Sequence, residues 1–332
     1  MRVRLNNSKK LEVIQMKKYL SVVVTIILLL SGCGKKQEEK KLVFAFVPKL
    51  LDNPVFQLAW QGAQGAAKDL GNGKIEVQRF APVKSDAVEQ AQIIESLIEK
   101  KVDGIAVSVN DADALTESIN KAVDAGIPVV CFDSDAPKSK RFAYYGTANF
   151  PSGKQMAEHL VKLMGTKGNI AILMGTPGAP NLEERRQGIL EYLKAYPDIK
   201  VVATEYCYDD VNKGVSVMEA AIQAHPDLKG WILPGAWALF TPPPGPFAAK
   251  KPGDLTVVSI DALPEQLDYV RQGYVQVLMG QKLWGWGYES VRMLKEFKEG
   301  KTPTQPVIDS GLDIITKENV EEYAMKWKTG KF

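Results

Sequence analysis

The segment from residue 102 to residue 137, VDGIAVSVNDADALTESINKAVDAGIPVVCFDSDAP, constrains the fold of this chain most, because it contains a complete β-α-β unit. The run GIAVSV is apolar and rich in β-branched residues, which is typical of a strand buried on both faces. Leu115 and Ile119 recur at the spacing of one helical face, and Gly126 ends that helix. IPVVCF follows as a second buried strand. The segment therefore predicts two parallel strands joined by a helix.

Asp133 directly follows the second of these strands. In open parallel sheets ligands bind outside the carboxyl ends of the strands, so this carboxylate is a candidate ligand contact. Aspartate and serine after a strand are also ordinary turn residues, and that alternative stays open for Asp133-Ser134-Asp135.

The same alternation of strands and helices continues on both sides of this unit, which predicts an α/β fold with two parallel-sheet domains. Residues 142–146 are expected to cross between them, the proline-rich segment Thr241–Pro252 to form a surface loop, and the residues after 298 to be less regular. The elements outside the central unit are strands at 42–47, 74–80, 169–174, 200–206, 230–233, 255–260 and 275–279, and helices at 54–67, 86–101, 152–164, 182–196, 211–224, 264–272 and 284–298.

Length and composition support this class of fold. The chain has 332 residues, of which 45% are hydrophobic and 24% charged, and this suits a soluble globular body with two domains. The net charge of +3 comes from basic residues scattered along the chain, so no nucleic-acid-binding surface is indicated.

The N-terminus has the pattern of an export signal. Basic residues from Met16 precede the apolar run SVVVTIILLL, which is too short to span a membrane comfortably, and Leu30-Ser31-Gly32-Cys33 resembles a bacterial lipobox. We expect residues 1–32 to be a signal peptide, Cys33 to be lipidated, and residues 33–41 to be a charged spacer. The protein should therefore be exported and anchored by its lipid to the cell membrane, at the extracytoplasmic face or in the periplasm. Cys131 and Cys207 are expected to be buried thiols, with a disulfide as the alternative.

Several short motifs stand in a fixed order along the chain. They are the segment Leu51–Phe56, Asp103-Gly104, Pro128-Val129-Val130 before Asp133, Asn181 with Arg185 and Gly188, Ser259-Ile260-Asp261, and Gly280-Gln281. In this order they resemble the type I periplasmic binding proteins of the ribose-binding kind. The resemblance covers about residues 42–315.

The resemblance implies two doubly wound parallel-sheet lobes joined by a three-crossover hinge. The first lobe would contain residues 42–145 and about 280–308, and the second residues 146–279 and about 309–332. The crossovers would lie near 145–147, near 279–281 and after Val307.

A sugar presents hydroxyls around its rim and weakly apolar faces, so its site needs acceptors and donors in the ring plane and aromatic rings above and below. Trp237 and Trp284 would either stack on the ligand or pack between the lobes. The ligand-binding residues implied by the resemblance are Lys49, Asn53, Phe56, Ser108, Asp133, Asn181, Arg185, Tyr208, Trp237, Asp261 and Gln281.

Two departures from the family pattern bear on the ligand. Pro234-Gly235-Ala236-Trp237 replaces the usual Asn-Asp after its strand, and Ser134 stands where ribose binders have an arginine, so ribose is not favoured. Lys49 with Pro234 and Ala236 is similar to the binding proteins for autoinducer-2 and rhamnose, although Asn181-Leu182 differs from the Asp-Gln of the autoinducer-2 type.

These features predict a monomeric solute receptor that binds a small sugar or polyol between two lobes and delivers it to the permease of an ATP-driven importer, without a cofactor or a metal. A chemosensory receptor is an alternative. An enzyme is not favoured, because the only histidines, His159 and His225, lie in no catalytic motif and neither phosphate-binding nor metal-binding spacings occur. A repressor would need a helix-turn-helix module where the signal peptide stands.

Overall fold

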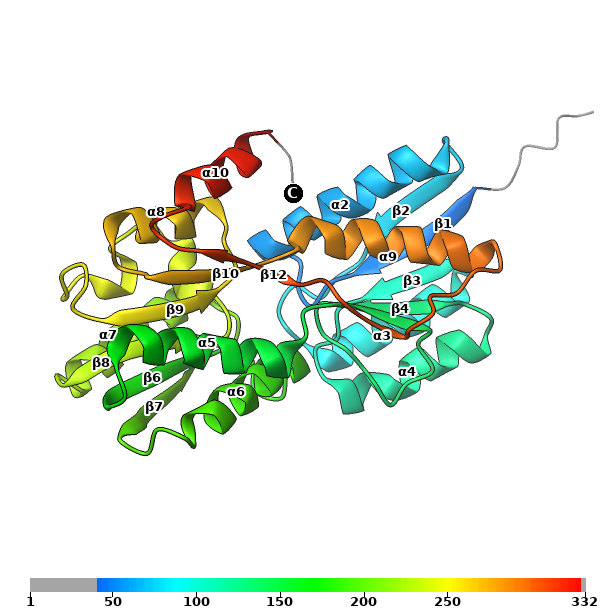
Figure 1. Cartoon of the computed structure of the whole chain (residues 1–332). Helices are drawn as coiled ribbons and strands as arrows, with labels where there is room; N and C mark the ends of the chain where they lie inside the picture. Colours follow the sequence, from blue (N-terminus) through cyan, green and yellow to red (C-terminus); the bar gives the residue numbers. More distant parts are fainter. Residues whose placement is uncertain (1–40, 330–332) are drawn as a thin grey trace, which may run out of the picture. The chain divides into compact units, whose positions relative to one another are not determined.

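The computed structural model describes residues 41–329, which form one compact unit. The predicted signal peptide and Cys33 lie outside the described residues. Two parallel sheets, each covered by helices, organise the described part of the chain (Figure 1). The predicted α/β class with two parallel-sheet lobes is confirmed.

The first sheet has six parallel strands in the order β11-β5-β4-β3-β1-β2. Phe44 and Phe46 on β1 face one side of it, and Ala45 and Val47 face the other, as the period of two requires. The strands are β1 (Leu42–Val47), β2 (Ile75–Arg79), β3 (Gly104–Val107), β4 (Val129–Phe132), β5 (Ala143–Gly146) and β11 (Val307–Asp309).

Helices cover both faces of this sheet, because every interior strand is apolar on both sides. Side chains of α2 and α9 pack with Phe44 and Phe46, whereas those of α3 and α4 pack with Ala45 and Val47. We call the sheet with these helices the first lobe. The helices are α2 (Pro54–Gly71), α3 (Ala87–Glu99), α4 (Ala112–Asp124) and α9 (Leu283–Lys298).

The second sheet has the order β12-β10-β9-β8-β6-β7, and only the edge strand β12 is antiparallel to its neighbour. We call this sheet with its helices the second lobe. Its strands are β6 (Gly168–Met174), β7 (Ile199–Tyr206), β8 (Leu228–Leu233), β9 (Thr256–Ile260), β10 (Val277–Gln281) and β12 (Leu312–Ile315), and its helices are α5 (Asn149–Met164), α6 (Pro180–Leu193), α7 (Val211–Ala224), α8 (Pro264–Gln272), α10 (Val320–Thr329) and the 3₁₀ turns η1 (Trp237–Phe240) and η2 (Gly245–Phe247).

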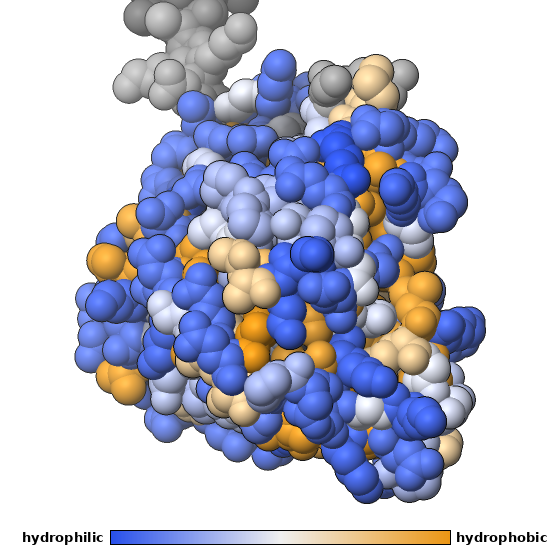
Figure 2. Space-filling model, turned by 90° about the vertical axis from the view of Figure 1, so that its left-hand side faces the viewer, coloured by the Kyte–Doolittle hydropathy of each residue, from blue (hydrophilic) through white to orange (hydrophobic). Residues whose placement is uncertain are grey.

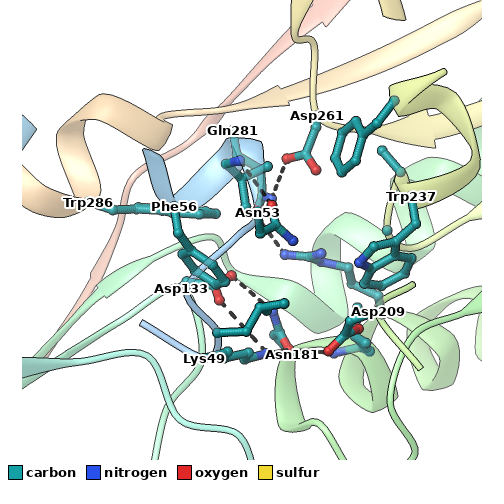
Figure 3. A pocket seen from close by; sticks show the side chains of 17 residues that line it. Lys49, Asn53, Phe56, Asp133, Asn181, Asp209, Trp237, Asp261, Gln281 and Trp286 are labelled. Atoms are coloured by element: carbon teal, nitrogen blue, oxygen red, sulfur yellow. Dashed lines mark hydrogen bonds and ion pairs between the residues drawn. The ribbon is translucent and has the colours of Figure 1, made fainter. Parts of the chain in front are cut away.

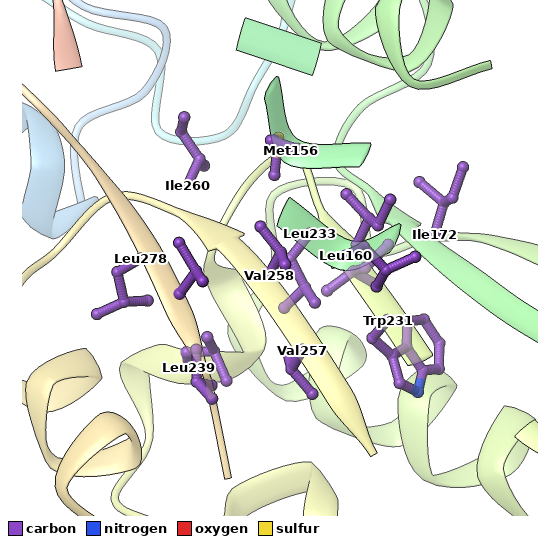
Figure 4. Packing of buried hydrophobic residues seen from close by; sticks show 14 of the residues in the cluster. Met156, Leu160, Ile172, Trp231, Leu233, Leu239, Val257, Val258, Ile260 and Leu278 are labelled. Carbon is purple, nitrogen blue, oxygen red and sulfur yellow. The ribbon is translucent and has the colours of Figure 1, made fainter. Parts of the chain in front are cut away.

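The core of the second lobe is built around its central strands. Trp231 on β8 is fully buried, with Leu160 of α5, Val257 and Val258 of β9 and Leu239 of η1 in the same cluster (Figure 4). The face of the molecule in Figure 2 is mostly hydrophilic, with apolar side chains gathered in small areas. Among residues 41–329, no helix combines the length and the apolar character that crossing a bilayer requires.

The chain passes between the two sheets three times. It leaves the first sheet after β5, returns from β10 into α9, and crosses again between β11 and β12. The connection from β10 into α9 lies beside the cavity described below, because Gln281 at the end of β10 lines it.

Three expectations about elements need correction. Residues 143–146 are not merely a crossing segment: they form β5, which pairs with β4 and β11. The predicted surface loop 241–252 is anchored by Phe247, which is buried and stacks on Tyr274 with ring centroids 6.0 Å apart. The segment after 298 contains β11, β12 and α10. Cys131 and Cys207 are free and buried, as expected.

Candidate ligand-binding site

A cavity lies where the carboxyl ends of the strands of both sheets meet. Both lobes contribute side chains to it, at the edge where parallel sheets bind ligands. The lining residues are Lys49, Leu50, Asn53, Val55, Phe56, Asp133, Asn181, Leu182, Arg185, Asp209, Gly235, Ala236, Trp237, Phe240, Asp261, Gln281 and Trp286.

Three carboxylates reach this cavity from the ends of strands. Asp133 follows β4, Asp261 follows β9, and Asp209 comes three residues after β7. All three have left-handed backbones, with φ of 58°, 67° and 61° respectively. Such backbones are unfavourable for residues other than glycine by roughly 1–3 kcal/mol, and they cluster at functional sites. The turns therefore point acceptors inward at a cost in local strain.

A polar network joins the two lobes on one side of the cavity. Asn181 at the start of α6 donates from Nδ2 to Asp133 Oδ1 at 2.9 Å and accepts at Oδ1 from Lys49 Nζ at 2.7 Å. Lys49 Nζ is also 3.8 Å from Asp133 Oδ2, which accepts from Ser108 Oγ at 2.7 Å. Figure 3 shows Lys49, Asn181 and Asp133 gathered at this point. The network places a cation and a carboxylate beside each other at the ligand edge.

A second network is centred on the buried Arg185. Its guanidinium donates to Asn149 Oδ1 at 3.0 Å, to the Pro234 carbonyl at 2.8 Å and to Gln281 Oε1 at 2.7 Å. Gln281 in turn donates from Nε2 to Asp261 Oδ1 at 2.7 Å. A guanidinium has five N–H donors, so two of them remain for a ligand.

Burial changes the proton affinity of two of these groups. It lowers the pKa of Lys49, although the nearby carboxylates of Asp133 and Asp209 act in the opposite direction. Burial raises the pKa of Asp261 to about 6, opposed by the hydrogen bond from Gln281 and by the charge of Arg185. Burial therefore disfavours the charged forms of Lys49 and Asp261, and hydrogen bonds with ligand hydroxyls would offset part of this desolvation cost.

Aromatic rings bound the cavity on two sides. Phe56 of α2 and Trp286 of α9 lie together on the first lobe, with ring centroids 6.4 Å apart. Trp237 of η1 lies on the opposite side (Figure 3). A Cβ atom at Gly175 or Gly235 would come within 2.4 Å or 2.2 Å of the Trp237 ring, so only glycine leaves room for the indole at these positions. The cavity thus combines polar walls with flat apolar faces.

Most of the residues implied by the resemblance lie on this cavity. Ser108 does not line it and instead donates a hydrogen bond from Oγ to Asp133 Oδ2. Tyr208 does not line the cavity either: it is 55% exposed, and Lys213 Nζ lies 4.1 Å from the centroid of its ring, so its contact with a ligand stays a prediction. The residues that line the cavity are Lys49, Asn53, Phe56, Asp133, Asn181, Arg185, Trp237, Asp261 and Gln281.

Sequence reasoning missed Asp209, Phe240 and Trp286, which also line the cavity. The sequence signal for Asp209 is its position just after a strand, a position that Tyr208 shares. Trp284 does not line this cavity: it stacks on Tyr288 with centroids 4.5 Å apart and packs against α2. Asn53 caps α2, since its Oδ1 accepts from the Val55 N–H at 3.0 Å, and it faces the cavity as well.

The donors and acceptors on this cavity suit a small neutral polyol. Within residues 41–329, no group of three or more His, Cys, Asp or Glu side chains is placed to hold a metal ion. Two sheet-based lobes with a polar and aromatic cavity at their shared strand edge and three crossovers define a two-lobed solute-binding protein.

Comparison with known proteins gives the same class. Residues 44–302 match the family described as periplasmic binding protein domain. The chain is 29% identical to the D-apiose import binding protein of Actinobacillus succinogenes over 75% of this chain and 79% of that protein. It is 28% identical to the ribose import binding protein of Bacillus subtilis over 64% of this chain and 72% of that one.

Solved structures agree with this fold. A solute-binding protein from Burkholderia graminis in complex with D-arabinose has a TM-score of 0.79 and 37% identity, covering 86% of this chain and 98% of its own. A solute-binding protein from Actinobacillus succinogenes with bound D-allose has a TM-score of 0.74 and 28% identity, covering 85% and 100%. The chain belongs to the periplasmic binding protein family.

Proposed function

We propose that this protein is a receptor that binds a monosaccharide or a similar polyol in the cavity between its lobes and delivers it to an ABC importer. The observation that carries the proposal is the cavity itself, in which carboxylates, amides, a lysine and an arginine surround a space bounded by aromatic rings. That combination matches the hydroxyl rim and apolar faces of a sugar. Its relatives support a sugar ligand, since they include binding proteins for apiose and ribose and structures with bound arabinose and allose.

Ligand binding would act through closure of the two lobes. Asp133 and Phe56 belong to the first lobe and Arg185 and Asp261 to the second, so a ligand that contacts both favours the closed arrangement. We propose the lobes as residues 42–145 with about 280–308 and residues 146–279 with about 309–332. The three crossovers are the hinge, and the importer's permease recognises the closed form.

The remaining parts of the proposal concern the working state of the protein. It is exported with residues 1–32 as a signal peptide and is anchored through a lipid on Cys33. It acts as a monomer, uses no cofactor and catalyses no reaction, because its carboxylates and cations bind the ligand by hydrogen bonds alone. A chemosensory receptor, as an alternative partner, would recognise the same closed form of the protein.

A second candidate ligand class is autoinducer-2 or rhamnose. Lys49 favours it, because the side chain reaches the cavity and donates to Asn181 at 2.7 Å. Competition between these compounds and pentoses or hexoses separates the two candidates.

Tryptophan fluorescence tests the proposal, since Trp237 and Trp286 line the cavity. The full chain in mild detergent is titrated with pentoses, hexoses, deoxysugars, inositols, rhamnose and autoinducer-2. A saturable change for one compound, reduced in a Trp237→Phe variant, supports the receptor function. A folded protein whose fluorescence responds to none of them contradicts it.

A further inference from the structure

Asp209 is the cavity carboxylate that the family resemblance did not indicate, and its position is unusual. It follows β7 through a turn in which Tyr208 and Asp209 both have left-handed backbones, with φ of 56° and 61°. Two consecutive residues other than glycine in this region are costly, so the surrounding structure must hold them. The turn places Tyr208 outside, where it is 55% exposed, and Asp209 on the cavity wall.

The Asp209 carboxylate is held at both oxygens by one residue. Thr176 donates from its backbone N–H to Oδ1 at 3.2 Å and from Oγ1 to Oδ2 at 3.0 Å. A carboxylate offers about four acceptor positions, so each oxygen retains capacity for a further donor. Within the described part of the chain, Asp209 forms no ion pair with a lysine or arginine, in contrast to Asp133 beside Lys49.

Two glycines create the space for this carboxylate and for the indole beside it. A Cβ atom at Gly175 would lie 2.3 Å from Asp209 Oδ1 and 2.4 Å from the Trp237 ring, and one at Gly235 would lie 2.2 Å from that ring. Asp209 and Trp237 therefore form one wall of the second lobe (Figure 3). A carboxylate next to an aromatic face is suited to a ring that stacks its C–H face and donates a hydroxyl at its rim.

We infer that Asp209 is a specificity-determining residue, positioned by Thr176, which accepts a hydrogen bond from one ligand hydroxyl that Asp133 and Asp261 do not contact. This inference rests on the proposed sugar-receptor function. It makes the hydroxyl on the Asp209 side a requirement for binding, because a ligand without it loses a hydrogen bond to a charged acceptor. An anionic sugar would be repelled at the same wall.

Calorimetric titration with the sugar that binds and with each of its monodeoxy analogues tests the inference. In the unaltered protein, removal of one particular hydroxyl should weaken binding by about 10- to 100-fold through loss of the contact with Asp209. In Asp209→Ala, removal of this one hydroxyl should weaken binding by about twofold or less, whereas removal of each other hydroxyl should weaken binding as much as in the unaltered protein. In Thr176→Val, the loss of affinity on removal of the same hydroxyl should be partly reduced. A variant that was merely misfolded would not change the effect of one hydroxyl alone.

The matched control is Asp210→Asn. Asp210 is the adjacent exposed carboxylate, which caps α7 by accepting from the Lys213 N–H at 2.8 Å, and asparagine retains that cap. Its deoxysugar profile should equal that of the unaltered protein. If the unaltered protein binds a sugar and Asp209→Ala shows the same losses of affinity across the deoxysugars, the role of Asp209 is overturned but the receptor proposal stands. A folded unaltered protein that binds no sugar overturns the receptor proposal and this inference together. Circular dichroism confirms that each variant is folded.

Discussion

The Asn181 side chain joins the two lobes, because its Nδ2 donates to Asp133 Oδ1 at 2.9 Å across the cavity edge. Asn181 lies in the first turn of α6 of the second lobe, and Asp133 directly follows β4 of the first. The two residues are 48 positions apart in sequence and meet only through the fold. The same amide accepts from Lys49, so one side chain links a carboxylate and an ammonium from the first lobe.

Loss of this link should weaken ligand binding. Asn181→Ala removes the amide and leaves Lys49 and Asp133 with one partner fewer, at a cost of roughly 1–3 kcal/mol in binding, which corresponds to about 5- to 150-fold in Kd. Calorimetry with the bound sugar measures the change. The control is Asn169→Ala, which removes an exposed amide at the far end of β6 and should leave Kd unchanged. An equal Kd for Asn181→Ala and the unaltered protein would contradict the prediction.

The raised pKa of Asp261 predicts a pH-dependent effect on stability. Its carboxyl has a pKa of about 6 in the folded protein and an ordinary value of 3.8, so between these pH values the folded state keeps a proton that the unfolded state has lost. Stability contributed by this group is therefore present at low pH and is lost as pH rises from about 4 through 6.

Asp261→Asn removes this titration and retains an acceptor for Gln281 Nε2. Relative to the unaltered protein, the variant should gain on the order of 2 kcal/mol in the free energy of unfolding between pH 4 and pH 7. Urea unfolding at several pH values measures the difference. A difference that does not change with pH, or that shrinks as pH rises, would show that the carboxyl titrates normally.

Close packing of α2 against α9 should be sensitive to a single methyl group. A Cβ atom at Gly287 would lie 1.8 Å from the Ala59 carbonyl oxygen, and the backbone there cannot yield cheaply. Gly287→Ala should destabilise the protein by about 1–3 kcal/mol or more, despite the higher helix propensity of alanine. Gln61→Ala on the exposed side of α2 is the control and should change the midpoint of thermal unfolding little. Equal midpoints for the two variants would refute the close contact.

Replacement of Trp237 and of Tyr208, two aromatic residues on the second lobe, should affect sugar binding differently. Trp237→Ala should weaken sugar binding by about 10-fold or more, because the indole is a wall of the cavity. Tyr208→Ala should leave Kd within about twofold, because that ring is exposed and lies outside the cavity. Parallel titrations of the two variants give the comparison. A larger loss for Tyr208→Ala would mean that the ring turns inward when ligand is present.

Strand ends could be predicted from sequence wherever an apolar run stops at a polar residue. Asp133 and Asp261 directly follow β4 and β9, and both lie on the cavity. Asp209 was not predicted to be a site residue. Tyr208-Asp209-Asp210 offers three polar candidates, and two successive left-handed backbones decide which side chain turns inward. Aspartate adopts a left-handed backbone more often than most residues, but this preference does not choose between Asp209 and Asp210.

The rotation of α9 about its own axis was the second feature that the sequence did not predict. Trp284 and Trp286 are two residues apart on α9, so they lie on opposite sides of the helix, and only Trp286 reaches the cavity. The contact of Gly287 with α2 sets this rotation, and a glycine inside a long helix was the available clue. β5 was missed as a strand because AYYG is short, and its pairing with β11 depends on residues more than 160 positions away.

Calorimetric titration of the full chain, with Asp133→Ala measured in parallel, tests the central claim most directly. The account predicts that one compound among pentoses, hexoses, deoxysugars, inositols and autoinducer-2 binds with one-to-one stoichiometry and micromolar or tighter affinity. It also predicts that Asp133→Ala weakens this binding by at least about 10-fold while the protein stays folded. Binding that is unaffected in Asp133→Ala, or no binding of any of these compounds to the folded protein, would contradict the account.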